Sequence, residues 1–297
     1  MKRYPSTIMA TCVVPWTESY ELDEERFRAC IRRHLTGLTD NLYIFGTAGE
    51  GYAVNDRQFD QVARLFWNEM QAGDGRALLG VISLSLSTIV ERIELGRDIG
   101  YREFQLSFPS WSPLSDTEVS AFFRETCDRF PDCKFLHYNS TAAKRRLTGD
   151  DYARLAAAHP NLVAVKTGGS RDHDEIVAML TKAPELQFFL SGPSYAAVRD
   201  DVECGWLISA GATNHAAARR LFAARGDELR AMAGGLDRIL EALFTSVGEG
   251  TWVDAVYDKV HAPDFPLRLL PPYTAGTEEM FARFRELMPA GWLPDAG

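Results

Sequence analysis

The sequence predicts an α/β protein, a (β/α)8 TIM barrel followed by a C-terminal helical extension. Eight short apolar runs rich in β-branched and aromatic residues recur along the chain, and stretches with helical spacing separate them. Such alternation is typical of a parallel sheet covered by helices. Eight units over about 220 residues favour closure into a barrel, and a doubly wound open sheet is the alternative.

The expected strands follow one another in order, and each is a short apolar run. Their length and their β-branched and aromatic content favour strands over helices. They are IMATCVV at 8–14, LYIFG at 42–46, ALLGV at 77–81, FQLSF at 104–108, KFLHY at 134–138, LVAVK at 162–166, QFFLS at 187–191 and WLISA at 206–210.

The expected helices are marked by their spacing and by their ends. One apolar face is formed by Phe27, Cys30, Ile31 and His34, which are spaced close to i, i+3, i+4 and i+7. Polar residues precede several helical stretches, and glycines follow them. The expected N-caps are Asn55 or Asp56, Ser115 and Thr148, and the glycines expected to end helices are Gly73, Gly75 and Gly100.

The strand pattern stops after about Arg225. Residues 229–260 and 278–288 have helical spacing, and a proline-rich segment joins them. We therefore expect a catalytic barrel domain over residues 1–225 and a C-terminal helical segment over residues 226–297.

Composition excludes several classes of protein. The 297 residues are 46% apolar and 25% charged, as in an ordinary soluble globular protein. A net charge of −9 argues against nucleic-acid binding. Five scattered cysteines indicate reduced thiols, and no apolar stretch is long enough to span a bilayer. We expect a cytoplasmic protein without nucleic-acid or membrane partners.

Lys166 is the most informative residue at the expected strand ends, where barrel enzymes carry their reactive groups. Its side chain extends from the end of a buried strand, where the ammonium must find a partner or lose its proton. It is therefore either a salt-bridge partner or an amine nucleophile toward carbonyls. Tyr138 ends the preceding run, about 5 Å away in a barrel. It favours the nucleophile, because a phenol can move the protons that imine formation requires.

The turn GTAGEG at 46–51 is a candidate carboxylate-binding site. It offers the hydroxyl of Thr47 and the successive backbone N–H groups of Ala48 and Gly49. The alternative is a purely structural glycine-rich turn. In both interpretations Glu50 organises the loop rather than acting as a catalytic acid.

These motifs together resemble the dihydrodipicolinate synthase and N-acetylneuraminate lyase family of class I pyruvate-dependent aldolases, over almost the whole chain. GTAGE at 46–50, YN at 138–139 and VAVK ending at Lys166 occur in the family's order and spacing. The resemblance implies that Lys166 forms a Schiff base with pyruvate or a related 2-oxo acid, while Tyr138 transfers protons. It also implies that Thr47 and the Ala48 N–H bind the keto acid carboxylate.

Further properties follow from the same resemblance. Gly192, Ile208 and Ser209 are implied to line the pocket. No metal or organic cofactor is implied, because the substrate is held as a covalent lysine imine, and the family typically forms homotetramers built as dimers of dimers. The expected partners are a small 2-oxo acid and an aldehyde or sugar-acid substrate.

Several positions depart from the family's pattern. Ala48 replaces a hydroxyl residue but keeps its backbone N–H. Ser110 and Trp111 stand where the synthase has a tyrosine pair that completes a proton relay, and an indole cannot relay a proton as a phenol does. Trp111, together with Trp16 after the first strand, instead suggests a more aromatic acceptor pocket, and packing at the barrel rim is the alternative.

A second departure concerns the acceptor's carboxylate. Ala143 stands where the synthase has an arginine that receives this group. The adjacent basic run of Lys144, Arg145 and Arg146 is the candidate replacement, and a solvated loop is the alternative.

Three functions remain in competition. The first is a Schiff-base lyase that performs aldol cleavage or condensation with pyruvate, or that dehydrates a 2-keto-3-deoxy acid. The second is dihydrodipicolinate synthase itself (4-hydroxy-tetrahydrodipicolinate synthase), against which the position of Trp111 argues. The third, of another class, is a catalytically inactive keto-acid-binding barrel.

Overall fold

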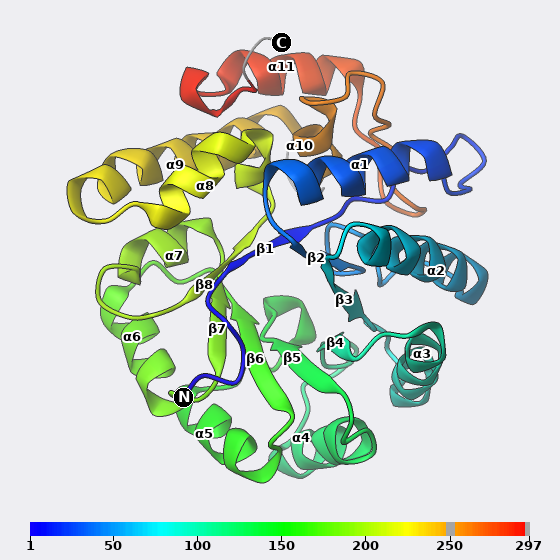
Figure 1. The fold of residues 1–297 in the computed structure, drawn as a ribbon, viewed down its shortest axis with the longest axis vertical. Coiled ribbons are helices and arrows are strands. Elements are labelled where there is room, and N and C mark those ends of the chain that lie inside the picture. The colour runs from blue at the N-terminus through cyan, green and yellow to red at the C-terminus, as the bar shows by residue number, and fades with distance from the viewer. Residues whose placement is uncertain (248–252, 295–297) are drawn as a thin grey trace. The chain divides into compact units, whose positions relative to one another are not determined.

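A computed structural model describes residues 1–247 and 253–294. Its eight parallel strands form a closed barrel in the order β1 to β8 and alternate with helices (Figure 1). The predicted (β/α)8 barrel with a C-terminal helical extension is confirmed. The strands are β1 Ile8–Thr11, β2 Asn41–Ile44, β3 Arg76–Gly80, β4 Glu103–Leu106, β5 Lys134–Tyr138, β6 Leu162–Thr167, β7 Gln187–Leu190 and β8 Gly205–Ile208.

The helices follow the strands in the predicted alternation, and α9 to α11 make up the C-terminal extension. The helices are α1 Glu24–Gly37, α2 Asp56–Ala72, α3 Leu86–Ile99, α4 Asp116–Phe123, α5 Gly149–Ala158, α6 His173–Lys182, α7 Gly192–Val198, α8 His215–Ala223, α9 Gly226–Val247, α10 Ala255–Lys259 and α11 Glu278–Leu287. Short turns of π or 3-10 helix are η1 Arg124–Asp128, η2 Thr141–Ala143, η3 Ala210–Thr213 and η4 Ala290–Trp292.

The helix boundaries show why these segments are helical. Asn55, Ser115 and Thr148 are the N-caps of α2, α4 and α5, as predicted, and each forms a reciprocal capping box. Each such cap contributes about 1 kcal/mol. Gly73 ends α2, and Gly100 ends α3 at a φ of 135°, which a residue with a side chain rarely adopts.

The chain divides into two compact units, which are described separately. The first unit comprises Met1–Thr7 and Ala77–Leu207, and the second comprises Ile8–Arg76 and Ile208–Gly297. The predicted domain boundary after residue 225 stays a prediction.

In the first unit, a buried polar pair fixes β5 to α5. The Nδ1 atom of His137 lies 2.8 Å from the hydroxyl of Tyr152, and the His137 ring packs 4.4 Å from that of Phe108, centre to centre. Complete burial lowers the pKa of His137 to about 3, so the imidazole is neutral. The strand is therefore fixed one residue before Tyr138.

In the second unit, the C-terminal helices pack on one another, and α11 runs beside α9 (Figure 1). The buried ammonium of Lys259 at the end of α10 donates to the carbonyls of Pro263 and Phe265 at 2.6 and 3.1 Å, and lies 3.0 Å from Glu278 of α11. These contacts hold the proline-rich segment in place. Of the predicted helical span 229–260, residues 248–252 lie outside the described residues.

Within residues 1–247 and 253–294, no helix has the length and apolar character needed to cross a membrane.

Candidate active site

Lys166 and Tyr138 lie together at the carboxyl ends of neighbouring strands in the first unit. They are paired residues in the β5–β6 ladder, so their side chains leave the same face of the sheet. The Nζ atom of Lys166 lies 3.8 Å from the centre of the Tyr138 ring. Both side chains are half-buried. The amine thus lies over the face of the Tyr138 ring.

Asn139 closes the loop that follows Tyr138. Its amide donates to the carbonyl of Leu147 at 2.9 Å and its side-chain oxygen accepts from the Leu147 N–H, also at 2.9 Å. Its backbone N–H bonds to the carbonyl of Lys166 at 2.8 Å. Sequence reasoning treated Asn139 only as part of a motif. A polar residue directly after a strand-end tyrosine is the signal that could have indicated this role.

The ends of β6 and β7 are packed closely together. A side chain at Gly168 would place its Cβ 2.3 Å from the hydroxyl oxygen of Ser191, so only glycine fits there. Ser191 is the N-cap of α7, and Gly192 is the first residue of that helix. Gly192 therefore stands at a helix N-terminus, where backbone N–H groups lack partners within the helix.

The basic run after β5 has three different sets of contacts. Lys144 donates to the carbonyl of Trp111 at 3.1 Å, and Arg145 pairs with Asp116 at 2.5 Å. Arg146 donates to the hydroxyl of Thr167 at 3.2 Å. Thr167 directly follows Lys166 in β6, so its side chain points to the opposite face of the strand from the amine.

The two tryptophans proposed as an aromatic acceptor wall have different environments. Trp111 is 80% exposed, so its indole is available on the surface of the first unit. Trp16, in the second unit, is completely buried and donates its indole N–H to Glu50 at 2.8 Å. Trp16 is therefore a core residue, which agrees with the packing alternative.

In the second unit, the turn after β2 is shaped by close backbone packing. A Cβ atom at Gly51 would lie 2.3 Å from the carbonyl oxygen of Phe45, and one at Gly49 would lie 2.8 Å from the Phe45 nitrogen. The hydrogen bonds that close the turn use the N–H groups of Glu50 and Gly51. Those of Ala48 and Gly49 take no part in this closure among the described residues, which suits them to an external acceptor.

Glu50 holds this turn to two other segments of the second unit. Its buried carboxylate accepts from the Trp16 indole at 2.8 Å and from the backbone N–H of Leu270 at 2.7 Å. Burial raises the pKa of Glu50 to about 6, against the opposing effect of these two donors. Glu50 thus has the partners of a loop organiser, as the sequence suggested.

The last two predicted pocket residues follow one another at the end of β8. Ile208 is 1% exposed and is the final residue of the strand, while Ser209 is half-buried and begins the 3-10 turn η3. Both belong to the second unit with Thr47, which is also half-buried. Their roles toward a substrate stay predictions.

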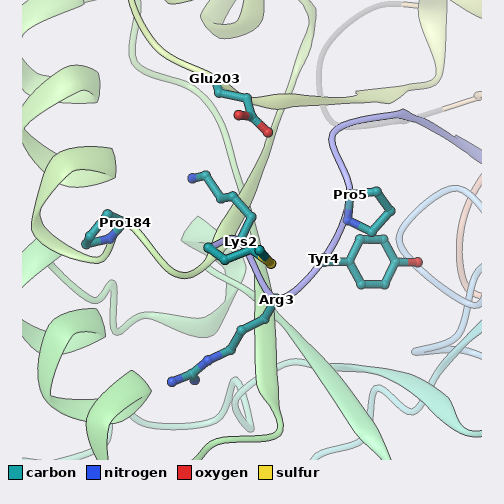
Figure 2. Close-up of a pocket in the computed structure, with 7 residues that line it drawn as sticks. Lys2, Arg3, Tyr4, Pro5, Pro184 and Glu203 are labelled. Carbon is teal, nitrogen blue, oxygen red and sulfur yellow. The ribbon is translucent and has the colours of Figure 1, made fainter.

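A separate surface pocket in the first unit lies at the opposite ends of the strands. It has a volume of about 590 Å³ and is lined by Met1 to Pro5, Pro184 and Glu203 (Figure 2). Its cations already bind backbone carbonyls, Lys2 that of Leu186 at 2.8 Å and Arg3 that of Ala156 at 3.0 Å. The amino-terminal end of a barrel serves stability rather than catalysis.

Comparison with curated proteins gives relatives with two different activities. The chain is 24% identical over 182 residues to 4-hydroxy-tetrahydrodipicolinate synthase of Exiguobacterium sp. strain AT1b, covering 61% of this chain and 59% of the relative. It is 24% identical over 183 residues to N-acetylneuraminate lyase 2 of Escherichia coli O6:H1, covering 57% and 58%. The chain thus spans about three-fifths of the length of these relatives.

Solved structures share the whole fold at low sequence identity. YagE of E. coli K12, described as a prophage protein of the dihydrodipicolinic acid synthase family in complex with pyruvate, matches with a TM-score of 0.81 at 14% identity, covering 95% of this chain and 97% of that one. CdNal of Clostridium difficile, solved with mannosamine, matches with a TM-score of 0.78 at 19% identity, covering 94% and 97%.

A family model decides the assignment. The model of the dihydrodipicolinate synthetase family matches residues 4–229, which include every strand of the barrel and all of the residues predicted to act on substrate. The chain belongs to the dihydrodipicolinate synthetase family.

Proposed function

We propose that this protein is a class I lyase that binds a 2-oxo acid such as pyruvate as a Schiff base on Lys166. The observation that carries the proposal is the position of its Nζ atom, 3.8 Å from the centre of the Tyr138 ring at the carboxyl ends of β5 and β6. Membership of the dihydrodipicolinate synthetase family supports it.

The proposed chemistry begins with attack of the Lys166 amine on the keto carbon. Tyr138 donates a proton to the resulting carbinolamine oxygen, which leaves as water and produces the imine. The Tyr138 phenolate then takes the proton of the hydroxyl on the fourth carbon, and the protonated imine accepts the electron pair of the bond between the third and fourth carbons. An aldehyde departs and an enamine remains. Protonation of the enamine and hydrolysis return pyruvate and free lysine. Dehydration of a 2-keto-3-deoxy acid proceeds through the same imine.

The proposal assigns the carboxylate of the keto acid to the turn after β2. The hydroxyl of Thr47 and the backbone N–H groups of Ala48 and Gly49 donate hydrogen bonds to it. Such paired N–H donors bind a carboxylate without an opposing positive charge. The proposal assigns the pocket walls to Gly192, Ile208, Ser209 and the exposed Trp111.

The proposal includes no metal or organic cofactor in this reaction, since the lysine imine itself withdraws the electrons. It also includes a homotetrameric assembly and a cytoplasmic location. The five cysteines are all free and buried, which suits a reducing compartment. A structural neighbour is described as a monomeric dihydrodipicolinate synthase variant, so light scattering of the purified protein is needed to test the tetramer.

The first test is reductive trapping with pyruvate and sodium borohydride. We expect a stable mass gain that maps to Lys166 and that is absent from Lys166→Ala. Lys144→Ala is the matched control, because this lysine is exposed and bonded to Trp111 in the same unit. Absence of an adduct with pyruvate and with a panel of 2-oxo acids would overturn the proposal.

A substrate screen then separates the remaining functions. Turnover of pyruvate with aspartate semialdehyde would identify a dihydrodipicolinate synthase, and release of pyruvate from a hydroxylated 2-oxo acid would identify a retro-aldolase. Loss of water from a 2-keto-3-deoxy acid would identify a dehydratase. An adduct at Lys166 without turnover of any of these would indicate the inactive keto-acid-binding barrel.

A further inference from the structure

Helices α1 and α10 of the second unit lie side by side (Figure 1) and are joined by side-chain contacts to Asp258. A buried cluster of side chains of the types that bind metals lies between them. Cys30 and His34 are one helical turn apart on α1 and share a face. Asp258 of α10 completes the cluster, and one potential ligand atom from each residue lies within 4.8 Å of the other two. All three are almost fully buried, at 0%, 1% and 3% exposure. Among the described residues, this is the one group of three or more such side chains with this geometry.

His34 is oriented as a ligand would be. Its Nδ1 atom lies 3.2 Å from Nε2 of His215, whose ring packs 4.7 Å from that of His261, centre to centre. The Nε2 atom of His34 faces the cluster and lies 3.3 Å from an oxygen of Asp258. Metal-binding histidines are typically held through the second ring nitrogen in this way.

Two further residues make the cluster suitable for a divalent cation. Arg33 donates to the same oxygen of Asp258 at 2.5 Å and so orients the carboxylate from outside the cluster. Cys12 at the end of β1 is completely buried and interacts electrostatically with both Cys30 and Asp258. The three negative charges of two thiolates and a carboxylate would neutralise the charge of a divalent cation and of the Arg33 guanidinium. The same cluster is also neutral with both thiols protonated and no cation bound.

We propose that this cluster binds one zinc ion through Cys30, His34 and Asp258, and that the neighbouring thiol of Cys12 supplies the fourth ligand. Thiolate, imidazole and carboxylate form a ligand set that zinc favours, and a closed, four-coordinate site is structural rather than catalytic. Each thiol releases its proton to solvent when it binds the metal. The ion ties α10 to α1, and it takes no part in the imine chemistry of Lys166.

The test uses Co²⁺ as a spectroscopic probe on the full chain after removal of metals with a chelator. We expect a thiolate charge-transfer band and intense tetrahedral d–d bands that saturate at one equivalent and disappear when Zn²⁺ is added. Plasma mass spectrometry of protein prepared with zinc is expected to find one zinc per chain. A folded wild-type protein that shows neither the bands nor bound zinc would overturn the proposal.

Variants assign the bands to this cluster. Cys30→Ala and His34→Ala are expected to lose the thiolate band or the tetrahedral spectrum, while Cys127→Ala, a buried thiol of the first unit, keeps both. If the cluster variants do not fold, the combined variant Cys127→Ala, Cys133→Ala and Cys204→Ala decides the question. This variant keeps only the thiols of Cys12 and Cys30, so any thiolate band that persists must come from them. Loss of the bands in this variant would overturn the assignment of the zinc site to this cluster. Pyruvate trapping at Lys166 is measured in parallel, so failure of one proposal does not imply failure of the other.

Discussion

The ends of β5 and β6 differ from the turn after β2 in what each contributes. In the first region two side chains, Lys166 and Tyr138, project from paired residues of an ordinary parallel ladder. In the second region the proposed functional groups are backbone N–H groups, and the chain there contains two non-glycine residues in the left-handed region, Phe45 at a φ of 64° and Glu50 at 53°. The first region should therefore be sensitive to side-chain chemistry, and the second to backbone volume and to the contacts of Glu50.

The largest expected effect comes from removal of the amine. Lys166→Ala should lower the rate of pyruvate methyl-proton exchange in deuterium oxide by at least about 1000-fold, because that exchange requires the enamine. Proton nuclear magnetic resonance measures it without an aldehyde substrate. Lys166→Arg is the matched control, since it keeps a cation above the ring but cannot form the imine. Exchange in either variant close to the wild-type rate would contradict the assignment.

The next effect concerns the phenol. Tyr138→Phe keeps the ring beneath the amine but removes the hydroxyl, so the same exchange should slow by about 100- to 10,000-fold. The borohydride adduct should still form at Lys166, only more slowly. An unchanged exchange rate would show that another group carries the proton, and the shared role of the two side chains would have to be abandoned.

In the second region the sensitive property is space. Gly51→Ala places a methyl group 2.3 Å from the Phe45 carbonyl oxygen, so we expect a loss of about 3 kcal/mol in the free energy of unfolding and weaker pyruvate binding. Urea denaturation and pyruvate titration measure these two effects. Gly234→Ala on α9 is the control, because nothing lies within 4 Å of its added Cβ. It should be neutral or stabilising by up to about 1 kcal/mol. Equal stabilities of the two variants would contradict the packing argument.

The smallest effect is a pH dependence at Glu50. Its native pKa of about 6 lies above the ordinary value, so the native carboxyl holds its proton more tightly than the unfolded one. The free energy of unfolding should therefore fall by about 2 kcal/mol as the pH rises from about 4 to 7, and the low-pH stability is the greater. Glu50→Gln should lose this slope in denaturation experiments across that range.

Glu118 is the control for this pH experiment. Hydrogen bonds from Ser115 lower its pKa, so replacing it should change the slope in the opposite direction. A slope that survives in Glu50→Gln would show that the pH dependence arises elsewhere.

Part of the candidate site could be predicted from sequence because it depends on order along the chain. Residues that end successive parallel strands must be neighbours, and this was sufficient to pair Lys166 with Tyr138. The environment of Trp16 could not be predicted in the same way. Its burial depends on Glu50, a residue of another loop, and on Leu270, which is 254 positions away in the chain.

The cluster around Asp258 shows the same limit. The i, i+4 spacing of Cys30 and His34 is visible in the sequence, where it marks only the apolar face of a helix. The third ligand comes from α10, more than 200 residues later.

The sequence by itself determined the alternation of strands and helices, the helix caps and the residues at the strand ends, because periodicity and capping are local properties. Only the tertiary structure decided which polar groups meet in the interior. Buried polar groups have no water to bond to, so their partners must be other protein groups, often from segments far away in the sequence. No local sequence pattern specifies which distant segment supplies the partner.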